Sequence, residues 1–232
     1  MTLQLSQLTE QVRTMGEVVA RRNRAQARLI EIARQWLSDY ADRAVELRRL
    51  ARANRAAIPA EEALDAIHPL PELPDRSVVV AADGSQIHPD RHGAALYHAI
   101  NIGSLIYRHG SGEAPEAASH ATLGYSEHDL YENGIPVAGN LLDVRRDLAE
   151  LRRLADICEA EPTRPVVALV DGPLVLWVLR DLPGSSREEK VTAYLDQLDR
   201  IRRSDAIVGG YISRPGSNEV TRLLHLAHIT SG

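Results

Sequence analysis

The stretch SVVVAADGSQ (residues 77–86) decides the fold expected for this chain. Three valines and two alanines form a short apolar run, which is typical of a strand buried in the middle of a sheet. The run leads directly into Asp83, so we expect a carboxylate where a central strand ends. A second stretch, PVVALVDGP (165–173), repeats the pattern and ends in Asp171. Two apolar strands that each end in Asp-Gly therefore form the expected centre of the fold.

The elements around these two strands indicate a mixed α/β sheet flanked by helices. Residues 94–110 predict two strands joined by a type II′ turn at Gly103-Ser104, and residues 119–125 predict a third. Helical spacing of apolar residues predicts a helix over 140–160. After the second apolar strand we expect three more elements, a helix at 188–204, a strand in DAIVGGYISRP and a helix in NEVTRLLHLAHI. Alternating helices and strands predict that the central strands are parallel.

The N-terminal part of the chain has a different character. Residues 5–54 carry a heptad-like apolar pattern that predicts a long helical appendage, with an apolar seam that packs on this chain or on a second copy. A short helix is expected from Pro59, and the proline-rich segment 68–75 reads as a linker. We therefore expect an N-terminal helical region at 1–67, for dimer or partner contacts, and a core domain at 76–232.

Composition and charge indicate where the protein is located and how it could bind nucleic acid. No apolar run approaches the roughly 20 residues that span a bilayer, and the N-terminus lacks a signal-peptide pattern, so we expect a cytoplasmic protein without membrane contacts. The net charge is −5, so nucleic acid would have to bind to local basic patches. Arginines of the helices at 140–160 and 188–204 could contact phosphates if they face one groove, although such arginines more often face solvent. Arg214, after the last strand, is better placed for a phosphate.

The two aspartates suggest a metal site. Parallel neighbouring strands bring their carboxyl ends together, and open α/β sheets bind ligands there. An Asp-Gly pair alone is more often a turn. However, Asp83 and Asp171 would repel each other at one sheet end unless a cation lay between them. Hard divalent ions prefer such oxygen ligands, and two of them suit phosphodiester hydrolysis.

A further ligand is expected from the helix at 140–160, whose acidic residues include Asp147, Glu150, Asp156 and Glu159. Spacing alone does not choose among them. On a helical wheel Glu150 lies well away from the centre of the aliphatic face, which by itself predicts a solvated side chain. Asp147 flanks that face more closely.

Four segments together resemble the NurA nuclease family: AADGSQ, RRDLAELRRLA, VALVDGPL and VGGYISRPGSNEVTRLL. They occur in the order and spacing of that family over about residues 77–225. The resemblance implies an RNase H-like core in which Asp83, Glu150 and Asp171 bind Mn²⁺ or Mg²⁺ and act in catalysis. It is this resemblance that favours Glu150 over Asp147.

The resemblance also implies partners. Members of the family form homodimers with a central channel, dock on the hexameric HerA-type ATPase and resect DNA ends from 5′ to 3′. The family continues beyond the YISRP strand and supplies a further Tyr and His from that later part, so we expect the core here to lack its C-terminal portion. Tyr211 and His225 are not expected to replace those residues.

Three hypotheses follow. The first is a metal-dependent DNA nuclease domain with metals on Asp83, Glu150 and Asp171 and with Arg214 neutralising phosphate charge. The second is a noncatalytic or incomplete subunit of the same fold that scaffolds a HerA-type ATPase. The third is an ATP-binding member of the wider superfold, although the sequence has no phosphate-loop pattern.

Overall fold

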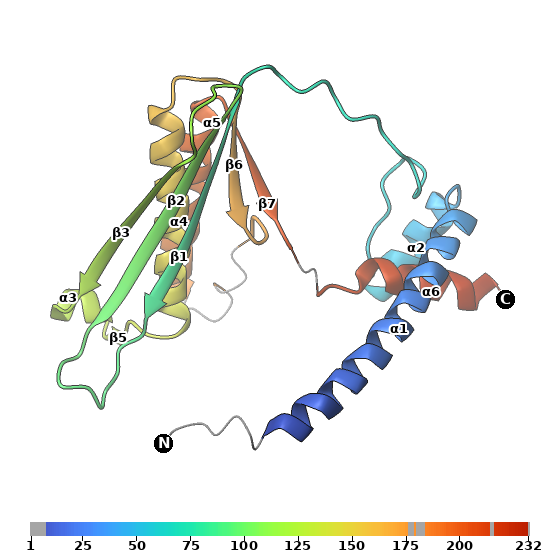
Figure 1. Ribbon diagram of the computed structural model, residues 1–232, viewed down its shortest axis with the longest axis horizontal. Helices are drawn as coiled ribbons and strands as arrows, with labels where there is room; N and C mark the ends of the chain where they lie inside the picture. The colour runs from blue at the N-terminus through green and yellow to red at the C-terminus, as the bar shows by residue number, and fades with distance from the viewer. Residues whose placement is uncertain (1–7, 176–178, 180–183, 214–215, 232) are drawn as a thin grey trace. The chain divides into compact units, whose positions relative to one another are not determined.

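The computed structural model describes residues 8–175, 179, 184–213 and 216–231 (Figure 1). The chain divides into two compact units, each with its own core. The sheet unit comprises Glu72–Arg214, and the helical unit comprises Met1–Pro71 together with Pro215–Gly232. The last helix therefore belongs with the N-terminal helices, whereas the sequence placed it with the core domain.

Three helices form the helical unit, α1 (Thr9–Asp39), α2 (Ala44–Asn54) and α6 (Glu219–Ser231). The heptad-like pattern is thus divided between two helices that break at residues 40–43. Trp36, near the end of α1, stacks on His228 of α6 with ring centroids 4.5 Å apart. No residue of α1 is buried, and the apolar side chains of its first two thirds are largely exposed.

The segment that begins at Pro59 forms no helix, so that prediction was wrong. The side chain of Arg48, on α2, explains the difference. Its guanidinium donates hydrogen bonds to the carbonyl oxygens of Pro59, at 3.1 Å, and Ala60, at 2.5 Å. These carbonyls would accept the first bonds of a helix, and a contact from a distant residue engages them instead.

A five-stranded sheet in the order β3-β2-β1-β6-β7 forms the centre of the sheet unit. Its strands are β1 (Ser77–Ile87), β2 (His98–His109), β3 (Glu116–Gly124), β6 (Val166–Asp171) and β7 (Ala206–Tyr211). The first three strands are antiparallel, and β6 and β7 run parallel to β1. The expected mixed sheet with parallel central strands is confirmed.

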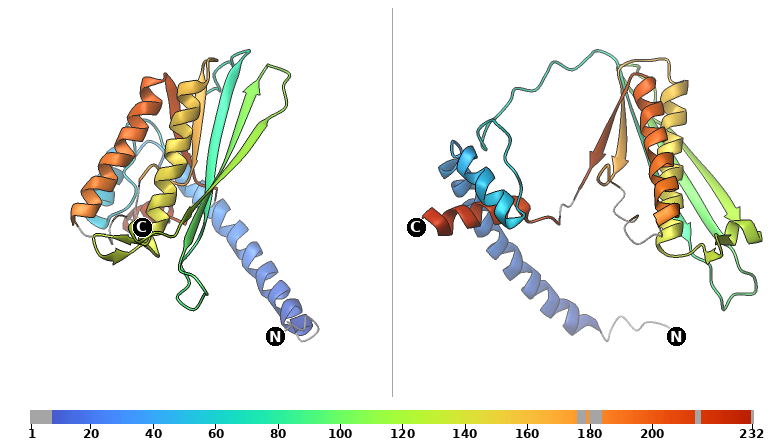
Figure 2. Two further views of the ribbon diagram at one scale, coloured as in Figure 1. Left: turned by 90° about the vertical axis from the view of Figure 1, so that its left-hand side faces the viewer. Right: turned by 180° about the vertical axis from the view of Figure 1, so that it is seen from behind.

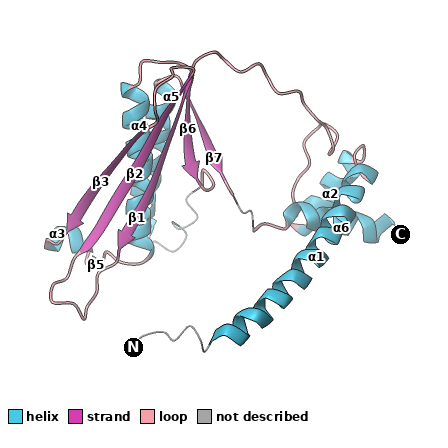
Figure 3. Ribbon diagram, viewed as in Figure 1, coloured by secondary structure: helices cyan, strands magenta, loops and turns pink. Residues whose placement is uncertain are grey.

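Two long helices, α4 (Asn140–Ala160) and α5 (Gly184–Arg203), lie side by side on one face of the sheet (Figure 2). The remaining elements are short (Figure 3). They are α3 (Glu127–Leu130), β4 (Tyr131–Glu132) and β5 (Ile135–Pro136). Among the helices described, none combines the length and the apolar character needed to cross a bilayer.

The predicted turn at Gly103-Ser104 is absent, because β2 runs unbroken through both residues. All eleven residues of β1 pair with β2, from Ser77 opposite His109 to Ile87 opposite Ala99. A strand of that length needs an equally long partner, so β2 continues through Gly103. The chain turns only after His109, before β3 begins at Glu116. The sequence could not reveal this because the length of β1 was itself underestimated.

The core of the sheet unit lies between the sheet and the helices α4 and α5. Alternate residues of β1, Val78 and Val80, are fully buried, as are Leu154 and Cys158 of α4 and Ile201 of α5. Complete burial of such an aliphatic side chain contributes about 1.5–3 kcal/mol. The opposite face of the sheet is far more exposed, with large side chains in contact with solvent at Leu105, Tyr107, Leu123, Ile207 and Tyr211.

Candidate active site

Asp83 and Asp171 are brought together by the register of the two central strands. Ala82 of β1 pairs with Val170 of β6, and each aspartate is the next residue along its strand. Asp171 ends β6, as predicted, but β1 continues beyond Asp83 to Ile87. Asp83 therefore lies within its strand and not at the end of it. The two residues therefore lie on adjacent strands at the point where β6 ends, beyond which β1 is paired only with β2 and has one open edge.

Glu150 approaches this point from α4, and Gly84 makes the approach possible. A Cβ atom on Gly84 would lie 2.5 Å from Oε1 of Glu150 and 2.6 Å from Cγ of Arg146, far closer than real contacts. The backbone N–H of Gly84 hydrogen-bonds the Glu150 carboxylate. Only 8% of Glu150 is exposed, so the helical wheel was wrong about its solvation. The absence of a side chain at position 84 allows this part of α4 to contact β1.

Four carboxylates line one cavity of about 330 Å³, namely those of Asp83, Asp147, Glu150 and Asp171. The buried ring of Tyr194, on α5, forms part of the wall. A second cavity, of about 530 Å³, also includes Asp83 and Asp171 but extends along β2 and β3 to Leu105 and Ala117. The two aspartates therefore lie where the two cavities adjoin, at the open edge of β1.

Arg146 supplies positive charge within the cavity. Its Nη2 lies 2.7 Å from Oδ1 of Asp147, and its Nε lies 3.2 Å from Oε1 of Glu150. Its Nη1 donates to Oε1 of Gln86 at 2.9 Å. The Gln86 amide in turn donates to Asp143 at 2.6 Å. A polar network between β1 and α4 thus fixes the guanidinium beside the acidic residues.

The environment of Glu150 makes its carboxyl a weaker acid than an exposed glutamate. Burial raises the pKa of its carboxyl to about 7, and the charges of Asp147 and Asp83 act in the same direction. Arg146 and the N–H of Gly84 lower this pKa and offset part of the effect. Close to neutral pH the protonated and ionised forms of this carboxyl are therefore both populated, and the ionised form is the one that binds a cation.

The acidic cavity provides ligands of the kind that Mg²⁺ and Mn²⁺ prefer, because all of its charged donors are carboxylate oxygens. As they stand in the part of the chain that the structure describes, no three His, Cys, Asp or Glu side chains converge closely enough to bind an ion. Arg146 contacts both Glu150 and Asp147. The residues fit a hard divalent cation in chemistry, and a cation held by Glu150 would compete with this guanidinium for the carboxylate.

Three of the four site residues predicted from the sequence lie in one cavity of the structure. Asp83, Glu150 and Asp171 line one cavity together with Asp147, which the sequence had left as the alternative to Glu150. Arg214 lies outside the described residues.

Sequence reasoning missed two residues of the cavity. It grouped Arg146 with the possible phosphate contacts, although the four-residue spacing to Glu150 was a usable signal for an ion pair. It did not identify Tyr194, whose pKa is raised by burial and then by the charge of Asp147. No local pattern in the sequence marks that tyrosine.

The strand order β3-β2-β1-β6-β7, with β6 and β7 parallel to β1, is that of an RNase H-like α/β domain. Its acidic site lies where the pairing of β1 with β6 ends. A family model described as the NurA domain matches residues 77–231, more than half of the chain. The chain belongs to the NurA family, as the sequence resemblance implied.

Several solved structures are similar to the chain at low sequence identity. The NurA nuclease from Sulfolobus solfataricus is 14% identical with a TM-score of 0.39, over 62% of this chain and 50% of that chain. A NurA structure bound to dAMP and manganese is 16% identical with a TM-score of 0.32, over 82% and 44%. LC11-RNase H1 in complex with an RNA/DNA hybrid is 12% identical with a TM-score of 0.32, over 59% and 86%. The chain spans about half the length of these NurA structures. No curated protein matches the chain.

Proposed function

We propose that this chain is a metal-dependent DNA nuclease domain of the NurA type. The observation that carries the proposal is the shared cavity of Asp83, Glu150 and Asp171, formed by three separate elements in a member of the NurA family. Carboxylates that converge at a sheet opening suit divalent cations, which stabilise the charge of a phosphodiester undergoing hydrolysis. The manganese in a related NurA structure makes Mn²⁺ the first ion to test, with Mg²⁺ as the alternative.

Each residue has a distinct part in this proposal. Asp83 and Asp171 would hold the cations from the edges of β1 and β6, and Glu150 would complete the ligand set from α4. Bound divalent ions would polarise the phosphodiester and favour attack by water. Arg146 neutralises acidic charge while the site is free of metal, and its guanidinium would be a donor to a phosphate oxygen near the cavity.

The experiment is cleavage of linear DNA in Mn²⁺ by the wild-type chain and by the single variants Asp83→Asn and Asp171→Asn. Asp196→Asn is the matched control, because Asp196 is an exposed carboxylate on α5 of the same unit. We expect cleavage to fall at least about a hundredfold in both site variants and to remain unchanged in the control. Thermal unfolding of each variant checks that the fold survives. Full cleavage by either site variant would remove the proposal.

Within this proposal the chain processes DNA ends in repair, in the 5′ to 3′ direction, as a homodimer that works with a HerA-type hexameric ATPase. The helical unit is the surface proposed for these contacts. Apolar residues that include Val12, Met15, Val19 and Leu29 are exposed along α1. Such a stripe is suited to packing against another helix. The molecular mass of the chain alone in solution tests the homodimer. The molecular mass after mixing with a HerA-type ATPase tests the complex.

A second candidate is a noncatalytic subunit that scaffolds the same ATPase. The observation in its favour is that no described set of three potential ligands is arranged to bind an ion. Stable complex formation without degradation of DNA in Mn²⁺ or Mg²⁺ would support the scaffold over the nuclease.

A further inference from the structure

A groove of about 630 Å³ lies between α4 and the strands β2 and β3. Four residues at helical spacing form its helix side: Ala149, Arg152, Arg153 and Asp156. Three cross-strand pairs form its sheet side: Ile100 with Thr122, Ile102 with His120, and Ser104 with Ala118. None of the four carboxylates of the acidic cavity lines this groove. It is a separate concavity on the other flank of the same helix.

Two arginines and one carboxylate line the groove. Arg152 is exposed and makes no hydrogen bond or ion pair with any residue that the structure describes. Nε of Arg153 donates to the hydroxyl of Ser104 at 3.2 Å, which is a neutral partner. The one carboxylate of the groove, Asp156, pairs with Arg200 at 2.7 Å, and Arg200 also pairs with Glu159 at 2.6 Å. Two guanidinium groups therefore face the groove without a carboxylate of their own.

This lack of partners is specific to one stripe of α4. On the same helix Arg145 pairs with Glu132 at 3.0 Å, and Arg146 pairs with Asp147 at 2.7 Å. Arg152 and Arg153 are therefore the two arginines of α4 that form no ion pair with a described residue.

The floor of the groove indicates what kind of anion fits. Ile102 is buried and Ile100 is half-buried, so the floor is apolar. Ser104 is only 9% exposed and accepts from Arg153, which leaves its hydroxyl proton for another acceptor. A nucleic-acid strand offers phosphates to guanidinium groups and flat base faces to apolar side chains. An acidic peptide offers the charge without the flat faces.

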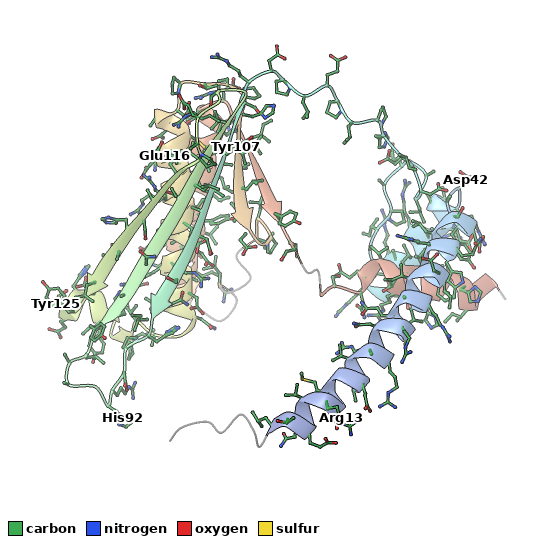
Figure 4. All side chains as sticks on the ribbon, in the orientation of Figure 1. Arg13, Asp42, His92, Tyr107, Glu116 and Tyr125 are labelled. Carbon is green, nitrogen blue, oxygen red and sulfur yellow. The ribbon has the colours of Figure 1, made fainter. Side chains whose placement is uncertain are left out.

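We infer that this groove binds a single strand of nucleic acid, with Arg152 and Arg153 on its phosphates. The choice of ligand rests on the proposed nuclease function. Ala149 lines the groove, and the next residue, Glu150, lines the acidic cavity. A helix is about 10–12 Å across with its side chains, so α4 separates a bound strand from the cavity by roughly one helix width. In Figure 4, Glu116 and Tyr125 mark the two ends of β3, between which the groove lies.

The test is binding of a fluorescent single-stranded oligonucleotide in EDTA, where no cleavage occurs, over a range of salt concentrations. The variants are Arg152→Ala/Arg153→Ala and the single Arg152→Ala. The matched control is Arg202→Ala/Arg203→Ala, which also removes two adjacent arginines from a helix of the sheet unit, but arginines that pair with Asp199. We expect the groove double variant to bind at least about tenfold more weakly, and the single variant to show an intermediate loss.

The dependence on salt separates a phosphate contact from a loss of folding. Each lost contact to a single strand reduces the slope of log affinity against log salt by about 0.7, so the groove double variant is expected to lose about 1.4. Equal losses in the groove and control variants, or no loss in either, would overturn the inference. Unchanged binding of the oligonucleotide together with lost binding of poly-glutamate would assign the groove to an acidic peptide and would also overturn it. Because Asp83→Asn leaves the groove intact, loss of cleavage in that variant is independent of this outcome.

Discussion

Arg146 and Glu150 form an ion pair inside the acidic cavity, with Nε of the arginine 3.2 Å from Oε1 of the glutamate one turn along α4. The protein thus provides its own cation where the proposed function requires a metal. A metal held by Glu150 would compete with this guanidinium for the carboxylate. We therefore expect the pair to link the stability of the metal-free domain to its affinity for divalent ions.

The variant Arg146→Gln tests this link. Without metal we expect a loss of about 1–3 kcal/mol of unfolding free energy, because the buried Glu150 loses its cation. With Mn²⁺ we expect tighter binding than in the wild type, since no guanidinium competes. Isothermal titration with Mn²⁺ and thermal unfolding measure the two effects, and Arg203→Gln is an exposed control. Weaker binding of Mn²⁺ by Arg146→Gln would show that the arginine assists the metal and does not compete with it.

The raised pKa of Glu150 predicts how the stability of the metal-free domain depends on pH. The unfolded chain releases this proton near its ordinary value of 4.5, and the folded chain releases it near 7. Between these values the folded state binds more protons, so stability falls as pH rises and then levels off above 7. The maximum loss is about 3 kcal/mol. Urea denaturation at pH 5 and 7.5 should show this loss in the wild type relative to Glu150→Gln. Parallel pH profiles for the two proteins would contradict it.

The contact between Gly84 and α4 predicts that Gly84→Ala is harmful. The added Cβ would lie 2.5 Å from Oε1 of Glu150, so the helix or the carboxylate must move, at a cost of about 1–3 kcal/mol. Gly16→Ala on α1 is the matched control. It meets nothing within 4 Å and should gain up to about 1 kcal/mol of helix propensity. Chemical denaturation measures both, and a neutral Gly84→Ala would mean that α4 adjusts freely.

Lys190, the only lysine of the chain, is expected to hold the β4–β5 hairpin against α5. Its Nζ lies 3.1 Å from Oε1 of Glu132, and only 10% of its side chain is exposed. Lys190→Met should cost about 1–3 kcal/mol, since Arg145 remains as a partner for Glu132.

The control for this ion pair is Arg34→Met, which breaks an exposed pair with Glu31 on α1. Its expected cost is about 0.5 kcal/mol or less. The measurement is thermal unfolding of both variants. Similar shifts in the two would show that burial adds nothing to the Lys190 pair.

The central strands, the helix at 140–160 and the order of elements were predictable, because each is marked by apolar residues at a local period. The register that joins Asp83 to Asp171 followed from the expectation of parallel neighbours. Other features depend on distant residues. The course of β2 through Gly103 depends on the length of β1, and the backbone near Pro59 depends on Arg48.

Within the candidate site, the burial of Glu150 is also a feature that local sequence patterns do not predict. Its burial depends on a glycine in another element, which a helical wheel drawn from α4 alone does not include. Family resemblance favoured Glu150 over Asp147 as a metal ligand, which stays a prediction, whereas periodicity alone predicted a solvated side chain. Arg146 was marked by its spacing, but a role inside the cavity required knowledge of the face that α4 presents to β1.

Cys158 has a practical consequence for all of these measurements. It is the only cysteine in the chain, it is fully buried in the core of the sheet unit, and burial raises the pKa of its thiol to about 11. An alkylating reagent can reach the thiolate only when α4 separates from the sheet. The rate of alkylation therefore reports how often the sheet unit opens, without any added probe.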